Sequence, residues 1–289
     1  MEITRKAYAK INLGLDVVGK RDDGYHLVKM IMQNVDIFDT LTFKDNEDGE
    51  IRLFSRSGKI PLDGNNLICR VAALLKEKYK VDRGADITLE KRIPVAAGMA
   101  GGSTDAAAAF LALNDLWDLG LDKDRLCELG VTLGADIPYC IVGGTALSEG
   151  IGEVLTPIND VPECNLVIAK PDIDVSTGWV YGELDSNEIT DHPDIDGIRS
   201  AIENSDLEGM CQRIGNVLER VTVSRYPVIT EIERILEDNG AIRAFMTGSG
   251  PTVYAVYREK ERAMEGLQAL KKTGLAPELF LSVPINPNR

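Results

Sequence analysis

The chain has 289 residues, which is enough for one large hydrophobic core or for two modest ones. Hydrophobic residues make up 44% and charged residues 27%, as is typical of globular proteins, and no segment has the apolar length of a bilayer-spanning helix. A formal net charge of −14 at pH 7 argues against nucleic acid or an anionic membrane as a partner.

In the first half of the chain, alternating apolar residues predict strands at about residues 3–18 and 31–43 and near residues 51–54. A helix is predicted from about Asn66, because a capping residue precedes apolar residues at helical spacing. The segments that follow are predicted as a strand (ADITLEKRI), a buried helix that starts at Ser103 or Thr104 (STDAAAAFLALNDLW) and a helix that ends at Gly134 (DKDRLCELGVTLG).

In the second half, GGTALSEGIGEVLTPI is predicted to return to strand, and CNLVIAKP begins a second set of elements. The predicted helices are DIDGIRSAIEN, DLEGMCQRIGNVLERV, VITEIERILEDNG and ERAMEGLQALKKTG; AIRAFMTGSGPTVYAVY is predicted as a hairpin. Strands and helices mix without strict alternation, which indicates an α+β fold. We expect two domains, residues 1–157 and 158–289, with the boundary near TPINDVPEC.

The segment PVAAGMAGGST, residues 94–104, is a glycine-rich loop that leads into an alanine-rich helix. A strand, a glycine loop and a helix in this order suit anion binding, because glycines admit a phosphate close to the backbone and the helix start offers unpaired N–H groups. The loop lacks the lysine of a P-loop, and its glycine spacing differs from the dinucleotide fingerprint. Ser103 and Thr104 are candidates to cap the helix, contact phosphate or hold a metal ion. Alone, the loop is equally consistent with small residues that only permit close helix packing.

Two other segments place a polar residue where chemistry is possible. In AYAKINLGL, strand alternation puts Lys10 and Asn12 on the face opposite the apolar residues, and the plainer interpretation is a strand with one solvated face. In LGADIPYC, Asp136 lies between a helix end and an apolar run. It is either a helix N-cap or a carboxylate at the mouth of a site, where it would accept or orient a hydroxyl proton.

The N-terminus, MEITRKAYAKINLGL, is charged and lacks the apolar core of a signal peptide, which favours a cytoplasmic location. The five cysteines are scattered without metal-ligand spacing, and we expect them to be reduced. With only His26 and His192 as histidines, the composition disfavours a zinc centre.

Taken together and in this order, three motifs resemble the kinase superfamily of galactokinase, homoserine kinase, mevalonate kinase and phosphomevalonate kinase. They are the strand KAYAKINLGL, the loop PVAAGMAGGSTDAAA and the glycine turn MTGSGPTVYAV, which alone would indicate only a hairpin. Met99 stands where the superfamily usually has Leu, and Thr104 with Asp105 completes a Ser-Ser-Asp-like end. The resemblance implies a two-lobed α+β fold, with a mixed sheet and helices in the N-terminal lobe and an antiparallel sheet and helices in the C-terminal lobe.

Within this superfamily, the chain is most similar to the family of kinases that act on 4-diphosphocytidyl-2-C-methyl-D-erythritol. The segments that carry this similarity are AKINLGLDVVGKRDDGYH, NNL, PVAAGMAGGSTDAAAA, LGADIPYC and, more loosely, KPDIDVSTGWVY. The resemblance implies transfer of the γ-phosphate of ATP to the 2-hydroxyl of the methylerythritol moiety, in the non-mevalonate route to isoprenoid precursors. It also implies ATP and Mg²⁺ as cofactors, and as partner a small molecule with a cytidine diphosphate group.

The resemblance assigns roles to individual residues. Lys10 and Asp136 match the catalytic pair of the family. The residues that match its ATP site are Asn66 on the adenine side and the phosphate loop of Pro94, Val95, Ala96, Ala97, Gly98, Met99, Ala100, Gly101, Gly102, Ser103 and Thr104. The residues that match its cytidine site are Asn12, Tyr25, His26, Thr177 and Tyr181. We expect Tyr25 and Tyr181 to clamp the cytosine by stacking; the alternative for DDGYH is a polar hairpin with an exposed tyrosine.

Two other functions stay open at this point. Another kinase of the superfamily, acting on homoserine or a mevalonate-like alcohol, would keep the loop and the glycine turn but has no use for GYH or an aromatic clamp. A non-catalytic sensor of nucleotide or sugar, built on the kinase fold, would be indicated by loss of Lys10 or Asp136, and both residues are present.

Overall fold

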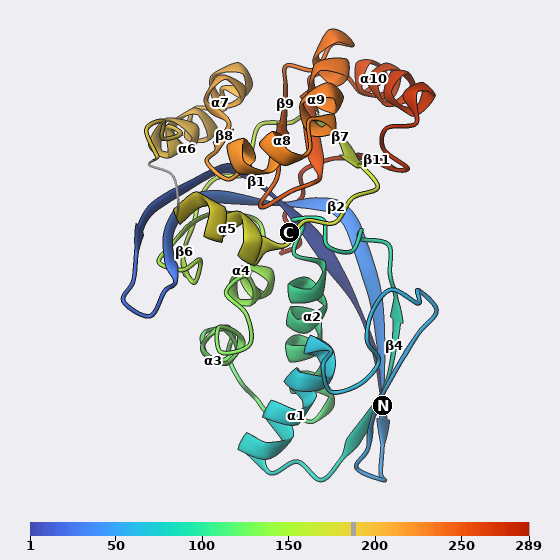
Figure 1. Ribbon diagram of the computed structural model, residues 1–289. Helices are drawn as coiled ribbons and strands as arrows, with labels where there is room; N and C mark the ends of the chain where they lie inside the picture. The colour runs from blue at the N-terminus through green and yellow to red at the C-terminus, as the bar shows by residue number, and fades with distance from the viewer. Residues whose placement is uncertain (186–188, 289) are drawn as a thin grey trace. The chain divides into compact units, whose positions relative to one another are not determined.

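The computed structural model describes residues 1–185 and 189–288 (Figure 1). The chain divides into two compact units. Unit 1 comprises Met1–Ala9, Ile37–Val95 and Ala100–Val142, and unit 2 comprises Lys10–Asp36, Ala96–Met99 and Gly143–Arg289. The long strands β1 (Glu2–Lys20) and β2 (His26–Asn46) therefore contribute residues to both units. A division into domains 1–157 and 158–289 stays a prediction.

Unit 1 combines a sheet with four helices. The C-terminal half of β2 pairs antiparallel with β4 (Gly84–Glu90), which pairs in parallel with β3 (Ile51–Ser55). The helices are α1 (Leu67–Tyr79), α2 (Gly101–Leu116), α3 (Lys123–Gly130) and α4 (Ile137–Val142). Figure 1 shows α1 and α2 side by side. The interpretation of Asp136 as an N-cap implies a helix after it, and α4 begins at the next residue. The predicted helix end at Gly134 is wrong, because α3 already ends at Gly130.

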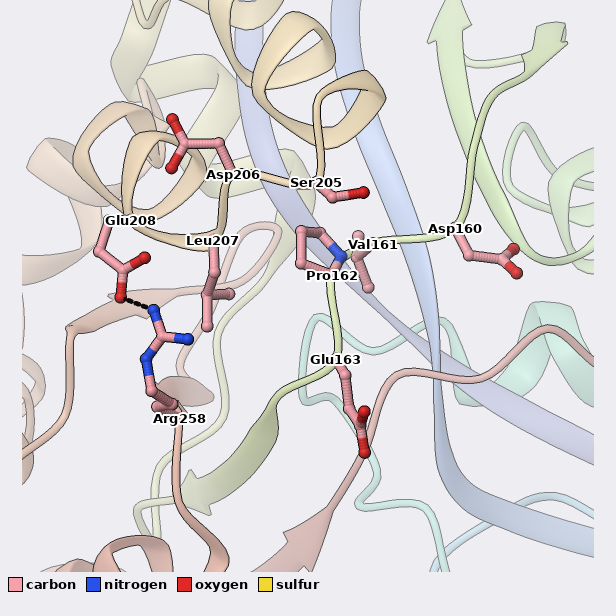
Figure 2. A pocket seen from close by; sticks show the side chains of 9 residues that line it. All are labelled: Asp160, Val161, Pro162, Glu163, Ser205, Asp206, Leu207, Glu208 and Arg258. Carbon is pink, nitrogen blue, oxygen red and sulfur yellow. Dashed lines mark hydrogen bonds and ion pairs between the residues drawn. The ribbon is translucent and has the colours of Figure 1, made fainter.

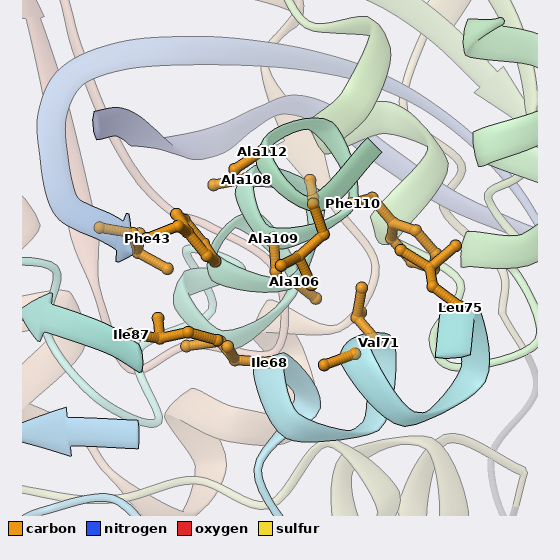
Figure 3. Packing of buried hydrophobic residues seen from close by; sticks show 14 of the residues in the cluster. Phe43, Ile68, Val71, Leu75, Ile87, Ala106, Ala108, Ala109, Phe110 and Ala112 are labelled. Atoms are coloured by element: carbon orange, nitrogen blue, oxygen red, sulfur yellow. The ribbon is translucent and has the colours of Figure 1, made fainter. Parts of the chain in front are cut away.

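The core of unit 1 lies between α2 and its neighbours. Figure 3 shows alanines of α2 near Phe43 and Ile87 of the sheet and Val71 of α1, while Leu75 of α1 lies beside Phe110. These side chains are buried, and each large one stabilises the fold by about 1.5–3 kcal/mol. Alanine side chains are short, so they let the sheet and α1 approach α2 closely.

Unit 2 contains a four-stranded antiparallel sheet covered by helices. Its strand order is β11 (Glu278–Ser282), β7 (Asn165–Lys170), β10 (Val253–Tyr257) and β9 (Arg243–Met246). Helices α9 (Val228–Asp238) and α10 (Lys260–Thr273) contact this sheet and bury an apolar cluster against it (Figure 1). The hairpin predicted for residues 241–257 is confirmed as β9 and β10.

The rest of unit 2 is built on the C-terminal half of β1 and the N-terminal half of β2. β1 pairs in parallel with the short β8 (Gly215–Asn216), and β2 pairs antiparallel with β5 (Thr145–Glu149), which pairs with β6 (Val154–Pro157). The remaining helices are α5 (Thr177–Asp185), α6 (Ile195–Glu203), α7 (Leu207–Arg213) and α8 (Glu219–Arg225). The mixture of helices and strands confirms the α+β class.

Three further predictions are wrong in detail. Residues 206–221 are not one helix, because Gly215 and Asn216 leave the helical path to pair with β1. The second face of β1 is not solvated: Lys10 and Asn12 are 4% and 2% exposed. Helix α2 begins at Gly101, ahead of Ser103 and Thr104.

In the described ranges, 1–185 and 189–288, no helix has both the length and the apolar character needed to cross a membrane.

Candidate active site

Lys10 lies on the part of β1 that belongs to unit 2. Its ammonium donates to Asn12 Oδ1 at 2.7 Å, and its backbone N–H donates to the carbonyl of Met99 at 3.2 Å. Residues two apart on a strand share one face, which explains the first contact. An amide oxygen carries no net charge, so this contact orients the ammonium without neutralising it.

The C-terminal glycine turn is joined to the same strand. The N–H of Asn12 donates to Thr247 Oγ1 at 2.9 Å, and Tyr254 OH donates to the carbonyl of Asn12 at 3.0 Å. The turn closes on itself through a bond from the N–H of Gly250 to the carbonyl of Thr247 at 3.0 Å. Thr247 and Tyr254 are fully or almost fully buried, so the strand and the turn form one rigid contact.

Gly98 and Gly248 bring the central loop against this turn. A Cβ atom added at Gly98 would lie 2.5 Å from the carbonyl oxygen of Thr247, and one added at Gly248 would lie 2.9 Å from the carbonyl oxygen of Gly98. Both glycines also have positive φ angles, +70° and +58°. Only glycine permits this approach of backbone to backbone. Parts of all three sequence motifs thus meet within unit 2.

The loop itself has an alternating backbone. Ala96, Gly98 and Ala100 have φ angles of +52°, +70° and +57°, while the residues between them have negative φ. Alternation of this kind turns successive N–H groups towards one side and forms a concave anion-binding nest. The segment that resembles a phosphate loop therefore has a backbone suited to phosphate.

Helix α2 follows directly, with Ala100 as its N-cap residue. A methyl group cannot cap a helix, so the N–H groups of the first turn stay available for an anion. The capping role considered for Thr104 is wrong, since its hydroxyl donates to the carbonyl of Tyr8 at 2.8 Å. Ser103 is half-buried in the first turn.

Asn66 caps helix α1. Its Oδ1 accepts from the N–H of Ile68 at 2.9 Å, and its Nδ2 donates to the carbonyl of Pro61 at 2.8 Å. The side chain thus organises the turn before α1. A contact of Asn66 with adenine stays a prediction.

Asp136 belongs to unit 1 and immediately precedes α4. Its carbonyl accepts from the N–H of Cys140 at 3.1 Å, and its side chain is half-buried. Burial raises the pKa of the neighbouring Tyr139 phenol well above 10, and the charges of Cys140 and Asp136 raise it further. Lys10 lies in the other unit, so the pairing of Lys10 with Asp136 stays a prediction.

The residues assigned to the cytidine end lie in unit 2. The rings of His26 and Tyr181 are in contact, with centroids 4.7 Å apart and planes tilted by 33°. Thr177 and Tyr181 are four residues apart on α5 and so share one helix face, although the sequence does not predict this helix. Tyr25 is 58% exposed in the turn between β1 and β2.

Two residues that hold the glycine turn are missed by the sequence analysis. Asn216 Nδ2 donates to the carbonyls of Met246 at 3.1 Å and Gly248 at 2.8 Å, and Thr222 Oγ1 donates to the carbonyl of Ser249 at 3.1 Å. Both donors lie in or near the segment predicted as one helix, so their sequence gave no signal of this role.

A separate pocket of about 450 Å³ opens elsewhere in unit 2 (Figure 2). Its lining includes four acidic residues: Asp160, Glu163, Asp206 and Glu208. Figure 2 shows Glu208 paired with Arg258, the basic residue of the lining. A lining of this charge repels nucleotide phosphates.

The three comparisons agree on one family. The model of the GHMP kinases N terminal domain matches residues 66–144, and that of the GHMP kinases C terminal matches residues 198–275. A 4-diphosphocytidyl-2-C-methyl-D-erythritol kinase of Lachnospira eligens is 46% identical and one of Enterococcus faecalis is 48% identical; the alignments cover 99% and 97% of this chain and 99% and 98% of those proteins.

A solved structure supports the same conclusion. The crystal structure of a 4-(cytidine 5′-diphospho)-2C-methyl-D-erythritol kinase superimposes with a TM-score of 0.83 and 29% identity, covering 98% of this chain and 99% of that one. The fold implied by the sequence motifs is therefore confirmed. The chain belongs to the 4-diphosphocytidyl-2-C-methyl-D-erythritol kinase family of the GHMP kinases.

Proposed function

We propose that the chain transfers the γ-phosphate of ATP to the 2-hydroxyl of 4-diphosphocytidyl-2-C-methyl-D-erythritol, giving the 2-phosphate and ADP in the non-mevalonate route to isoprenoid precursors. The observation that carries this proposal is the 46–48% identity to kinases of that name over nearly the full chain. The short motifs expected to bind ATP and the cytidine end are all present in the aligned span.

The ATP phosphates would bind residues 94–104. The alternating φ angles at Ala96, Gly98 and Ala100 and the uncapped start of α2 support this assignment, because both present N–H groups to an anion. Asn66 would lie at the adenine side. The net charge of −14 makes such a local array necessary, because the protein as a whole repels a polyanion.

Phosphoryl transfer would proceed directly, in line and without a phosphoenzyme. Asp136 would accept or orient the proton of the substrate hydroxyl. The ammonium of Lys10 would offset charge that develops on the transferring phosphoryl group, since it is buried and bonded to the uncharged Asn12 amide. A nearby ammonium would also keep the Asp136 carboxylate ionised.

Mg²⁺ would accompany ATP and neutralise part of the phosphate charge. Within residues 1–185 and 189–288, no group of three or more His, Cys, Asp or Glu side chains could hold a metal ion. In kinase sites Mg²⁺ usually keeps several waters and is bound by substrate phosphates and one or two protein oxygen ligands. Ser103 is the better protein candidate, because the hydroxyl of Thr104 already donates to Tyr8.

The cytidine end would bind near His26 and Tyr181. Their rings already lie against each other, so an aromatic platform exists in unit 2. Thr177 on the same helix face and Asn12 would add polar contacts. Tyr25, exposed in the adjacent turn, would close over the base.

An assay coupled to ADP release tests the substrate assignment. The purified chain is given Mg-ATP with 4-diphosphocytidyl-2-C-methyl-D-erythritol, homoserine or mevalonate in parallel. We expect turnover with the cytidine-linked alcohol alone. Turnover with homoserine or mevalonate at a comparable kcat/KM would refute the assignment, and ATP binding without any turnover would favour a sensor.

Variants of the proposed pair test the mechanism. Lys10→Ala and Asp136→Ala should each lower kcat by about a hundredfold or more, since each removes a group that acts on the transition state. Lys6→Ala, on the same strand but exposed, is the control and should keep normal turnover. Near-normal kcat in either folded variant would show that the assignment is wrong.

A further inference from the structure

A buried ion cluster lies in unit 1, outside the residues assigned above. The ammonium of Lys91 bonds to Asp39 Oδ2 at 2.5 Å and to Asp105 Oδ2 at 2.9 Å. The three side chains are 7%, 0% and 6% exposed. Removing two carboxyl groups and one ammonium from water costs folding free energy unless their mutual contacts compensate for the lost hydration. We therefore expect the cluster to serve a function.

The cluster joins both ends of the glycine loop. Asp39 Oδ1 accepts the backbone N–H groups of Arg92 and, at 2.9 Å, of Ile93, which lie directly before the loop. Asp105 lies on the second turn of α2, directly after the loop. Because Lys91 bonds to both carboxyl groups, it ties the entry of the loop to its exit.

Gly101 lets the cluster approach the start of α2. A Cβ atom added at Gly101 would lie 3.3 Å from the ammonium of Lys91 and 3.1 Å from Cγ2 of Ile93. A side chain there would require Ile93 and Lys91 to shift by a few tenths of an ångström. Glycine at this position thus lets Lys91 and Ile93 lie close to the first turn of α2.

The cluster is built to hold the loop and not to bind phosphate. Two carboxyl groups already receive the ammonium of Lys91, so it has little positive charge to offer a ligand. Burial raises the pKa of Asp105 to about 8, the charge of Lys91 opposes this rise, and the charge of Asp39 adds to it. Among the described residues, no hydrogen-bond partner reaches Asp105 Oδ1, so Oδ2 is the anchor to Lys91.

We propose that Lys91, Asp39 and Asp105 are positioning residues, which close the base of the loop and so fix the left-handed backbone at Ala96 and Ala100. Left-handed alanines are strained, and strain of this kind persists only where the surroundings impose it. The cluster supplies that constraint without touching ATP. The proposal rests on the proposed function, in which this loop binds the ATP phosphates.

Two substitutions of similar size separate the hydrogen bond from the volume of the side chain. Asp105→Leu removes the acceptor for Lys91, whereas Asp105→Asn keeps an amide oxygen that accepts from it. We expect Asp105→Leu to weaken binding of a non-hydrolysable ATP analogue about tenfold and to speed amide hydrogen exchange in residues 94–104 of the ligand-free protein. The KM for the cytidine-linked alcohol should stay unchanged, and Asp105→Asn should behave nearly as wild type.

Asp115→Asn is the matched control. Asp115 lies on the same helix and pairs with Arg5, but both side chains are exposed and distant in sequence from the loop. This variant should keep wild-type nucleotide affinity and exchange. If Asp105→Leu loses thermal stability while its folded form keeps wild-type affinity and exchange, the cluster is merely structural and the proposal is wrong.

Two measurements keep the test decisive if Asp105→Leu does not fold. Lys91→Met removes the ammonium at similar volume and should reproduce the loss of nucleotide affinity; wild-type affinity in this variant overturns the proposal. If neither variant folds, exchange in the wild-type protein decides. The amide of Thr104, which donates to the carbonyl of Ala100, and the amide of Asp105 should then exchange as slowly as the core of α2. Exchange at these two amides as fast as in the exposed turns would overturn the proposal.

The wild-type assay separates this proposal from the function on which it rests. If the wild-type chain binds the ATP analogue but phosphorylates no alcohol, the proposed function is refuted. The proposal for the cluster is then decided by the binding and exchange measurements alone. A fully active wild type with unchanged Asp105→Leu refutes the cluster alone.

Discussion

Glu219 and Glu233 form a half-buried carboxyl pair in unit 2, next to the strand that leads into the glycine turn. Glu219 Oε2 accepts the N–H of Met246 at 2.9 Å. Burial raises the pKa of Glu219 to about 7 and that of Glu233 to about 9, and for Glu233 the charge of Glu219 adds to the rise. Arg243 opposes both shifts and Glu237 adds to them. The pair therefore holds a proton that free glutamates would have lost.

This proton makes stability depend on pH. A raised carboxyl pKa in the folded state stabilises the fold fully below the unfolded value of 4.5, and the contribution is lost as pH rises through about 9. Wild-type stability should thus fall by about 1 kcal/mol per pH unit between pH 6 and 9 relative to Glu233→Gln, in which position 233 no longer titrates. Thermal unfolding across this range checks the difference. Glu231→Gln, an exposed change on the same helix, should run parallel to wild type.

At the residue scale, the sequence predicted the identity of the polar groups better than their surroundings. Lys10 and Asn12 stand out because they interrupt the apolar pattern of one strand. Their burial could not be predicted, since it depends on what covers the second face of that strand. That cover includes Thr247, which lies 235 residues from Asn12 along the chain.

At the scale of elements, two glycine substitutions test whether the glycine loop and the glycine turn constrain each other. Gly98→Ala would force a strained positive φ and a clash with the carbonyl of Thr247 at 2.5 Å. Gly120 has nearly the same φ, +66°, and among the described residues an added Cβ there meets open space. We expect Gly120→Ala to destabilise the fold by about 1 kcal/mol and Gly98→Ala by about 3 kcal/mol or more.

Gly98→Ala should also weaken binding of an ATP analogue, whereas Gly120→Ala should leave it unchanged. Thermal unfolding and calorimetric titration of both variants measure the two effects. Equal losses of stability would mean that the loop and the turn do not constrain each other.

The error at residues 206–221 has the same origin as the missed contacts of the turn. The apolar spacing of this segment continues across Gly215 and Asn216, so periodicity alone favours one helix. The break is caused by pairing of these two residues with Gly14 and Leu15 of β1. Asn216 then uses its amide to hold the glycine turn. Local patterns carry no information about such distant partners.

For the whole molecule, the α+β class, the order of most elements and the three kinase motifs could be predicted, because each depends on residues that are close in sequence. The composition of the two compact units could not. Unit 2 takes in Lys10–Asp36 and Ala96–Met99 as well as Gly143–Arg289, and only long-range pairing determines this. The ion cluster could not be predicted for the same reason, because Lys91 is 52 positions from Asp39 and 14 positions from Asp105.

The net charge of the whole molecule predicts an unusual response to salt. Mg-ATP and the cytidine-linked alcohol are both anionic, and a chain of net charge −14 repels them over long distances. The Debye length falls from about 30 Å at 0.01 M to about 8 Å at 0.15 M salt, so salt screens this repulsion while contacts at hydrogen-bond distance are screened much less. We therefore expect the association rate of a fluorescent ATP analogue, measured by stopped flow, to rise several-fold over this range. A protein that captured ATP through a broad basic surface would show a falling rate, and that result would contradict recognition by a few local N–H groups and Lys10.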